Sequence, residues 1–65
     1  MVNILGKVYI STKEAAQRYG YSQQWFRLCR HDKVGPPFVK LQGKGKVYYP
    51  LDEADKWFRD NMIID

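Results

Sequence analysis

Sixty-five residues with a formal net charge of +4 limit the chain to one small basic domain. Hydrophobic residues make up 45% of the sequence and aromatic residues 15%, which is too apolar for a disordered segment, so the chain can fold. A domain this small has little room for an enclosed substrate pocket, and the single Cys29 and single His31 supply neither an internal disulfide nor a zinc-ligand cluster. We therefore expect one domain over residues 1–65 that is not an enzyme, needs no cofactor or metal and takes no small-molecule substrate.

The charge is divided unevenly along the chain. Residues 7–48 carry nine basic and two acidic side chains, whereas residues 49–65 carry two basic and five acidic ones. Such a division is typical of a domain that turns one face toward a polyanion, although a merely solvated surface is the alternative. Residues 1–7 are too short and polar for a signal-peptide core, and no apolar run approaches the roughly 18 residues of a membrane span. We expect an intracellular protein that does not bind a membrane.

The first strong local signal is the pair Ser11 and Glu14, which matches a capping box. In this motif the serine hydroxyl accepts from a backbone N–H, and the glutamate side chain reaches back to the cap residue. The pattern predicts a helix that begins at Thr12 and ends near Gly20, a residue suited to the left-handed conformation that closes helices. The β-branched and aromatic run 8–10 before it predicts an extended lead-in.

A second helix is predicted almost immediately after the first. Ser22 is an N-cap candidate, and residues 23–31 contain good helix formers and no breaker. Two short helices joined by a turn of about three residues centred on Gly20 are typical of a helix-turn-helix, and an ordinary helical hairpin is the alternative. We expect the apolar side chains of this helix to pack in the core rather than to stack on bases: Trp25, Phe26 and Cys29.

A β-hairpin and a third helix are predicted for the rest of the chain. Prolines 36 and 37 exclude a helix there, residues 38–41 and 47–49 read as two strands, and 42–46 reads as a turn rich in glycine and lysine. Pro50 suits the first turn of an amphipathic last helix that ends near residues 60–61. The apolar tail 62–65 either docks on the core or contacts a partner.

These elements together predict an α+β fold, namely a small winged helix-turn-helix with three helices and a two-stranded β-hairpin wing. In that arrangement the recognition helix, about residues 22–31, enters the major groove, and the basic wing 42–46 lies beside it. Ser22, Gln23 and Gln24 are the candidates for base readout, because glutamine can pair bidentately with adenine.

Six basic residues complete the predicted DNA-binding surface. Arg27 follows Gln23 by four residues on the same helix face, so we expect it to contact a base or a phosphate. Glycines in the wing let the backbone approach DNA, where lysines neutralise phosphates or enter the minor groove; a solubilising hairpin tip is the alternative. Lys13 lies in the first turn of the first predicted helix, where the positive end of the helix dipole disfavours a cation unless an anion such as a phosphate lies nearby. A tolerated exposed lysine is the alternative. The six are Lys13, Arg27, Arg30, Lys33, Lys44 and Lys46.

Residues 11–58 resemble the small winged-helix DNA-binding proteins of the MerR-like superfamily, which include phage excisionases and AlpA-type regulators. The matching segments are 12–16, 21–26, 35–41, 47–49 and 57–58. The resemblance implies sequence-specific binding of double-stranded DNA in a bacterium or a phage-infected host, for transcription control or for excision of a mobile element. It also implies further copies of the chain on adjacent sites, or an integrase-type recombinase, as partners.

One departure from the family pattern concerns the recognition helix. Members often carry an aromatic residue followed by arginine in its middle, where this chain has Arg27 and Leu28, so the arginine is displaced by one position. One position rotates a side chain by about 100° around a helix. The family's contact therefore does not transfer directly to Arg27.

Two other functions compete with this interpretation. The small subunit of a phage terminase has a similar DNA-binding part but normally continues into an assembly region, whereas we expect this chain to be complete with only residues 61–65 after the fold. A protein-binding adaptor would use Trp57, Phe58 and the tail 62–64 as an apolar patch and would not need a basic wing.

Overall fold

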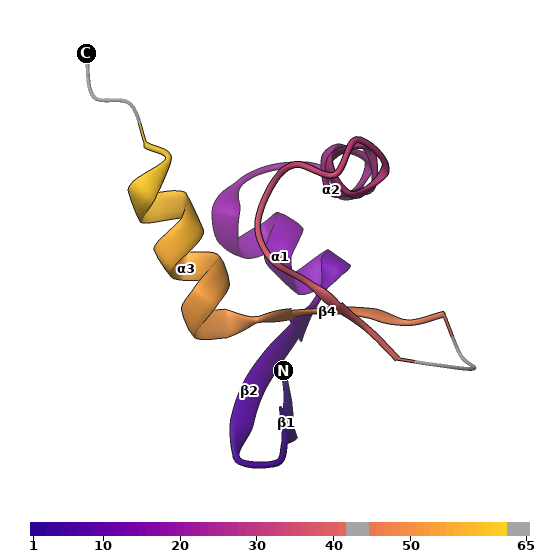
Figure 1. Cartoon of the computed structure of the whole chain (residues 1–65), viewed down its shortest axis with the longest axis vertical. Helices are drawn as coiled ribbons and strands as arrows, with labels where there is room; N and C mark the ends of the chain where they lie inside the picture. The colour runs from indigo at the N-terminus through magenta and orange to yellow at the C-terminus, as the bar shows by residue number, and fades with distance from the viewer. Residues whose placement is uncertain (42–44, 63–65) are drawn as a thin grey trace.

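The computed structural model describes residues 1–41 and 45–62. It has three helices and a four-stranded antiparallel sheet, which confirms the predicted α+β class (Figure 1). The elements in chain order are β1 (Val2–Ile4), β2 (Lys7–Ser11), α1 (Thr12–Tyr19), α2 (Gln23–His31), β3 (Val39–Lys40), β4 (Val47–Pro50) and α3 (Leu51–Asp60). Among the described residues, no helix has the length and apolar character needed to traverse a bilayer.

The sheet corrects the prediction of a separate two-stranded wing. β3 and β4 pair as an antiparallel hairpin, with Val39 opposite Tyr48, as predicted. β4, however, also pairs with β2, and β2 pairs with β1, so the strand order is β1-β2-β4-β3. The lead-in at residues 8–10 is therefore an inner strand. The hairpin gains a rigid base, because its inner strand is hydrogen-bonded on both sides.

The β1–β2 hairpin was not predicted from the sequence. Its two-residue turn places both Leu5 and Gly6 at positive φ, 52° and 79°, as a type I′ turn requires. Glycine or asparagine normally occupies such positions, so a sequence with leucine at the first of them does not indicate a hairpin.

The second correction concerns β3, which covers only Val39–Lys40 rather than residues 38–41. It is a short edge strand that begins just after two prolines without N–H donors.

The two predicted helix starts are confirmed by their caps. Ser11 Oγ accepts from the backbone N–H of Glu14 at 3.1 Å, while Glu14 Oε1 accepts from the backbone N–H of Ser11 at 3.0 Å. Gly20 ends α1 in the left-handed conformation, with φ of 78°, and Ser22 Oγ accepts from the backbone N–H of Trp25 at 3.1 Å. α3 differs slightly from the prediction, because Pro50 is the last residue of β4 and immediately precedes the helix.

The core is small and receives one residue from each of five elements. Each of the five is at most 1% exposed: Ile10, Ala15, Phe26, Tyr49 and Ala54. Of the three residues of α2 that were predicted to face the core, Phe26 is fully buried, and Trp25 and Cys29 are half-buried. Phe26 is the one fully buried side chain of α2 among the described residues, and its ring packs against Tyr49 of the sheet.

A polar cluster joins α1 to α3 at the edge of this core. Arg18 Nε and Nη2 donate to the two carboxylate oxygens of Asp55 at 2.9 and 2.8 Å, and the Tyr19 hydroxyl donates to Asp55 Oδ1 at 2.6 Å. The hydrogen bond from Arg18 holds the pKa of Asp55 below its ordinary value. Burial, together with the hydrogen bond to Asp55, raises the pKa of Tyr19 to about 12.

We expect Tyr19→Phe to cost about 1 kcal/mol of stability at neutral pH, because it removes a partly buried hydrogen bond to a charged acceptor. The raised pKa of Tyr19 also predicts a pH dependence: its contribution is complete below about pH 10 and is lost as pH rises toward 12. Urea unfolding at pH 7, 10 and 12 measures both effects. Tyr21→Phe is the control, because that hydroxyl makes no hydrogen bond within the described residues. Equal alkaline losses in Tyr19→Phe and the unmodified chain would contradict the assignment.

Candidate nucleic-acid interface

The outward face of α2 is a continuous exposed stripe. Gln24, Arg27, Leu28 and His31 are exposed and recur at the three- and four-residue spacing of one helix face, whereas Phe26 points into the core. Gln23 is exposed beside the stripe. At 1.5 Å per residue the helix is roughly 13 Å long, so a stripe along its length can follow the floor of a major groove about 12 Å wide.

A shallow hollow of about 330 Å³ lies beside this stripe, and three of the predicted DNA-binding residues line it. Lys13 comes from the first turn of α1, Gln23 from the first residue of α2, and Lys46 from the approach to β4. These residues are 33 positions apart at most in sequence, and the fold alone brings them together. Figure 1 shows the β3–β4 hairpin extending to the right, on the side of α2, and α3 on the left.

The remaining predicted residues are placed differently. Lys33 is exposed in the turn after α2, where its backbone adopts a positive φ of 58°. The Ser22 hydroxyl serves as the N-cap acceptor of α2, and its O–H can still donate to another partner. Lys44 and the other residues of the wing tip, 42–44, lie outside the described residues. Arg30 differs from the other predicted contacts, because its guanidinium turns inward to Tyr49 rather than outward.

Ion pairing leaves the cations of this face available. In the described part of the chain, four carboxylates are paired, and none of them is paired with Lys13, Arg27, Lys33 or Lys46. Glu14 pairs with the amino terminus, and the other three pairs are Lys7–Glu53 at 2.5 Å, Arg18–Asp55 at 2.8 Å and Lys56–Asp60 at 2.7 Å. The four paired carboxylates lie on α1 and α3, whereas α2 and the described part of the β3–β4 hairpin carry basic side chains and no carboxylate.

Two residues of the exposed stripe were missed by the sequence interpretation. Leu28 is 51% exposed and lies one helical turn after Gln24, and His31 continues the same face. The four-residue spacing from Gln24 was visible in the sequence, but the sequence interpretation assigned no DNA contact to Leu28 or His31. An exposed leucine on a recognition helix can contact the methyl group of thymine.

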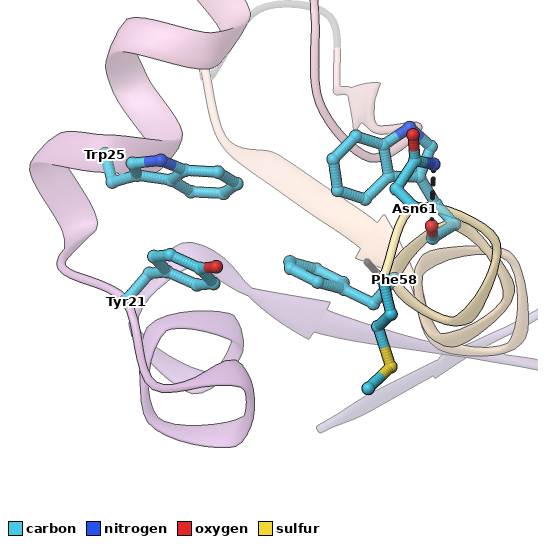
Figure 2. A pocket seen from close by; sticks show the side chains of 6 residues that line it. Tyr21, Trp25, Phe58 and Asn61 are labelled. Carbon is cyan, nitrogen blue, oxygen red and sulfur yellow. Dashed lines mark hydrogen bonds between the residues drawn. The ribbon is translucent and has the colours of Figure 1, made fainter. Parts of the chain in front are cut away.

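An aromatic groove between α2 and α3 is the second feature of the surface (Figure 2). The ring of Tyr21 stacks on Trp25 with centroids 4.3 Å apart, and Phe58 faces both rings from α3. Asn61 Nδ2 donates to the backbone carbonyl of Trp57 at 2.8 Å and so closes the end of α3. The groove has a volume of about 360 Å³, and its lining residues are Tyr21, Trp25, Trp57, Phe58, Asn61 and Met62.

No protein-family model, no curated protein and no solved structure matches the chain. The resemblance to MerR-like winged-helix proteins therefore stays a prediction from the sequence. A function has to be inferred from the side chains of the α2 stripe and its hollow, and from the charges around them.

Proposed function

We propose that the chain binds double-stranded DNA in a sequence-specific manner, as a winged helix with α2 as the recognition helix and the β3–β4 hairpin as the wing. The observation that carries the proposal is the convergence of Lys13, Gln23 and Lys46 on one hollow beside the exposed stripe of α2. A helix flanked by a basic hairpin offers base contacts and phosphate contacts from one face.

The residues of this face would have separate tasks on DNA. Gln23 and Gln24 are at the N-terminal end of α2, which is the end that reaches base edges in helix-turn-helix complexes. Leu28 would contact a thymine methyl group, and Arg27 would contact a phosphate or a base. Lys13 at the start of α1 and Lys46 would hold phosphates in the hollow beside the first residue of α2, where the N-terminal dipole of α1 adds to the attraction.

The biological use of such binding is either excision of a mobile element or transcription control inside a bacterial or phage-infected cell. Excision requires several copies side by side on bent DNA, with an integrase-type recombinase as partner. Transcription control requires binding at a promoter site and does not require the DNA to bend. A gel assay with circularly permuted DNA fragments measures bending and separates the two uses.

The test of DNA binding is a titration with two labelled duplexes, one selected from a random library by the chain and one with the same bases scrambled. We expect tight binding to the selected duplex and a log–log salt slope of about −4 to −5, because about four to six phosphates would be contacted. A salt-insensitive complex, or no preference for the selected duplex, would contradict the proposal.

Lys46→Ala tests the role of the hairpin. We expect it to weaken binding to both duplexes and to reduce the salt slope by about one unit, because one phosphate contact is lost. Lys56→Ala is the control: it removes the same charge from α3, where Lys56 is paired with Asp60 at 2.7 Å. If the two variants change the slope equally, net charge rather than a wing contact explains the effect.

A second candidate function, a protein-binding adaptor, is favoured by the aromatic groove between α2 and α3. Binding there would bury apolar surface and would be nearly independent of salt. Trp57→Ala would abolish adaptor binding and leave DNA binding unchanged, whereas Lys46→Ala would do the reverse.

A further inference from the structure

We propose that Arg30 is a positioning residue that fixes the recognition helix relative to the wing, and that it does not contact DNA itself. This inference rests on the DNA binding proposed above. It reassigns a residue whose sequence position, three residues after Arg27 on a basic helix, predicted a direct contact.

The geometry around the guanidinium carries the inference. Arg30 Nη1 donates to the Tyr49 hydroxyl on β4 at 2.6 Å and lies 3.4 Å from Thr12 Oγ1 at the start of α1. Its Cζ atom is 6.0 Å from the ring centres of both Phe38, just before β3, and Tyr49. Arg30 of α2 therefore contacts Phe38 just before β3, Tyr49 on β4, and Thr12, the first residue of α1.

These contacts reach the same elements that line the basic hollow. Tyr49 is 1% exposed, so it cannot touch DNA, but it is only three residues from Lys46, which immediately precedes β4. A strand extends about 3.3 Å per residue, so Lys46 lies about 10 Å along the chain from Tyr49. A tilt of β4 at Tyr49 would therefore displace Lys46 relative to Gln23. Fixing Arg30 on Tyr49 thus sets the spacing between readout residues and wing.

The chemistry of the pair suits a fixed link. Burial raises the pKa of Tyr49, so its hydroxyl stays neutral and can accept from arginine at physiological pH. A planar guanidinium can donate to a hydroxyl and lie against a ring at the same time, whereas a lysine ammonium is a point charge on a flexible stem. Lysine at position 30 would keep the charge and lose the geometry.

Four variants separate positioning from phosphate contact, with affinities measured on the selected and scrambled duplexes at a temperature where circular dichroism shows each variant folded. We expect Tyr49→Phe, Arg30→Met and Arg30→Lys each to weaken binding to the selected duplex about five- to tenfold. Binding to the scrambled duplex should change less than about twofold, and the double variant Tyr49→Phe/Arg30→Met should be no weaker than either single one. Tyr9→Phe, which removes a phenol hydroxyl from β2, is the control and should bind normally.

Direct phosphate contact predicts another pattern. Arg30→Lys would then bind normally, Tyr49→Phe would have no effect, and Arg30→Met would lower the salt slope by about one unit. That pattern would overturn the proposal, as would unchanged affinity in Tyr49→Phe by itself.

A measurement on the free protein keeps this inference separate from the question of DNA binding. Spin labels at Leu28→Cys on α2 and Lys40→Cys on β3, in a Cys29→Ala background, report the distance between helix and hairpin by pulsed electron resonance. We expect Tyr49→Phe to broaden or shift the distance distribution and Tyr9→Phe to leave it unchanged. An unchanged distribution in Tyr49→Phe would overturn the positioning role even if the chain binds DNA, and failure to bind any duplex would overturn only the proposed function.

Discussion

Phe26→Ala is expected to leave most of the chain unfolded at 25 °C. The ring is fully buried and packs edge-on against Tyr49 with centroids 5.3 Å apart, and it also contacts Trp25 and Phe58. Truncating a buried phenylalanine costs about 3–5 kcal/mol, and a single core in a domain of this size rarely supplies more than that. Urea unfolding monitored by circular dichroism measures the change.

The control for this experiment is Leu28→Ala, which truncates a neighbouring apolar residue on the same helix that is 51% exposed. We expect a loss of less than about 0.5 kcal/mol there, because a surface side chain leaves no cavity. If Phe26→Ala cost as little as Leu28→Ala, the attachment of α2 to the sheet would not depend on this ring.

Gln24→Ala should weaken binding to the selected duplex by about 1–3 kcal/mol, with little change on the scrambled duplex. Gln24 is exposed at the start of α2, where a carboxamide can pair bidentately with adenine. The same loss is expected for Gln23→Ala. Affinity measurements on both duplexes test this directly.

Gln17→Ala provides the matched control, since Gln17 is an exposed glutamine on α1, outside the α2 stripe and its hollow. It should bind both duplexes normally. Equal losses on the selected and scrambled duplexes in Gln24→Ala would show that the residue contacts the backbone or supports the fold rather than reading bases.

Local chemistry explains why the helices could be predicted. Caps depend on neighbouring residues, so Ser11 with Glu14, Gly20 and Ser22 fixed the ends of α1 and the start of α2 before any tertiary contact was known. The β3–β4 hairpin was found in the same way, from glycines and lysines between two apolar runs. Its place in a larger sheet was not found, because pairing of β4 with β2 joins residues about forty positions apart.

The candidate site was predictable only in part for the same reason. Exposed polar residues of α2 follow from helical spacing, so Gln23, Gln24 and Arg27 were placed correctly on the exposed side. Arg30 has the same spacing, but its partner Tyr49 is nineteen residues away on another element. No local sequence pattern indicates the hydrogen bond between Arg30 and Tyr49. Because no carboxylate partner for Arg30 could be recognised in the sequence, the residue was predicted to contact DNA.

The most direct test of the central claim is an NMR titration of the ¹⁵N-labelled chain with the selected duplex. The proposed interface predicts that amide shifts change at residues 12–13, 22–31 and 45–48, and that those of β1 and of residues 57–62, at the end of α3 and just beyond it, do not. Changes centred on residues 57–62 with the α2 stripe unaffected, or no changes at all at low salt, would contradict DNA recognition by α2 and the hairpin.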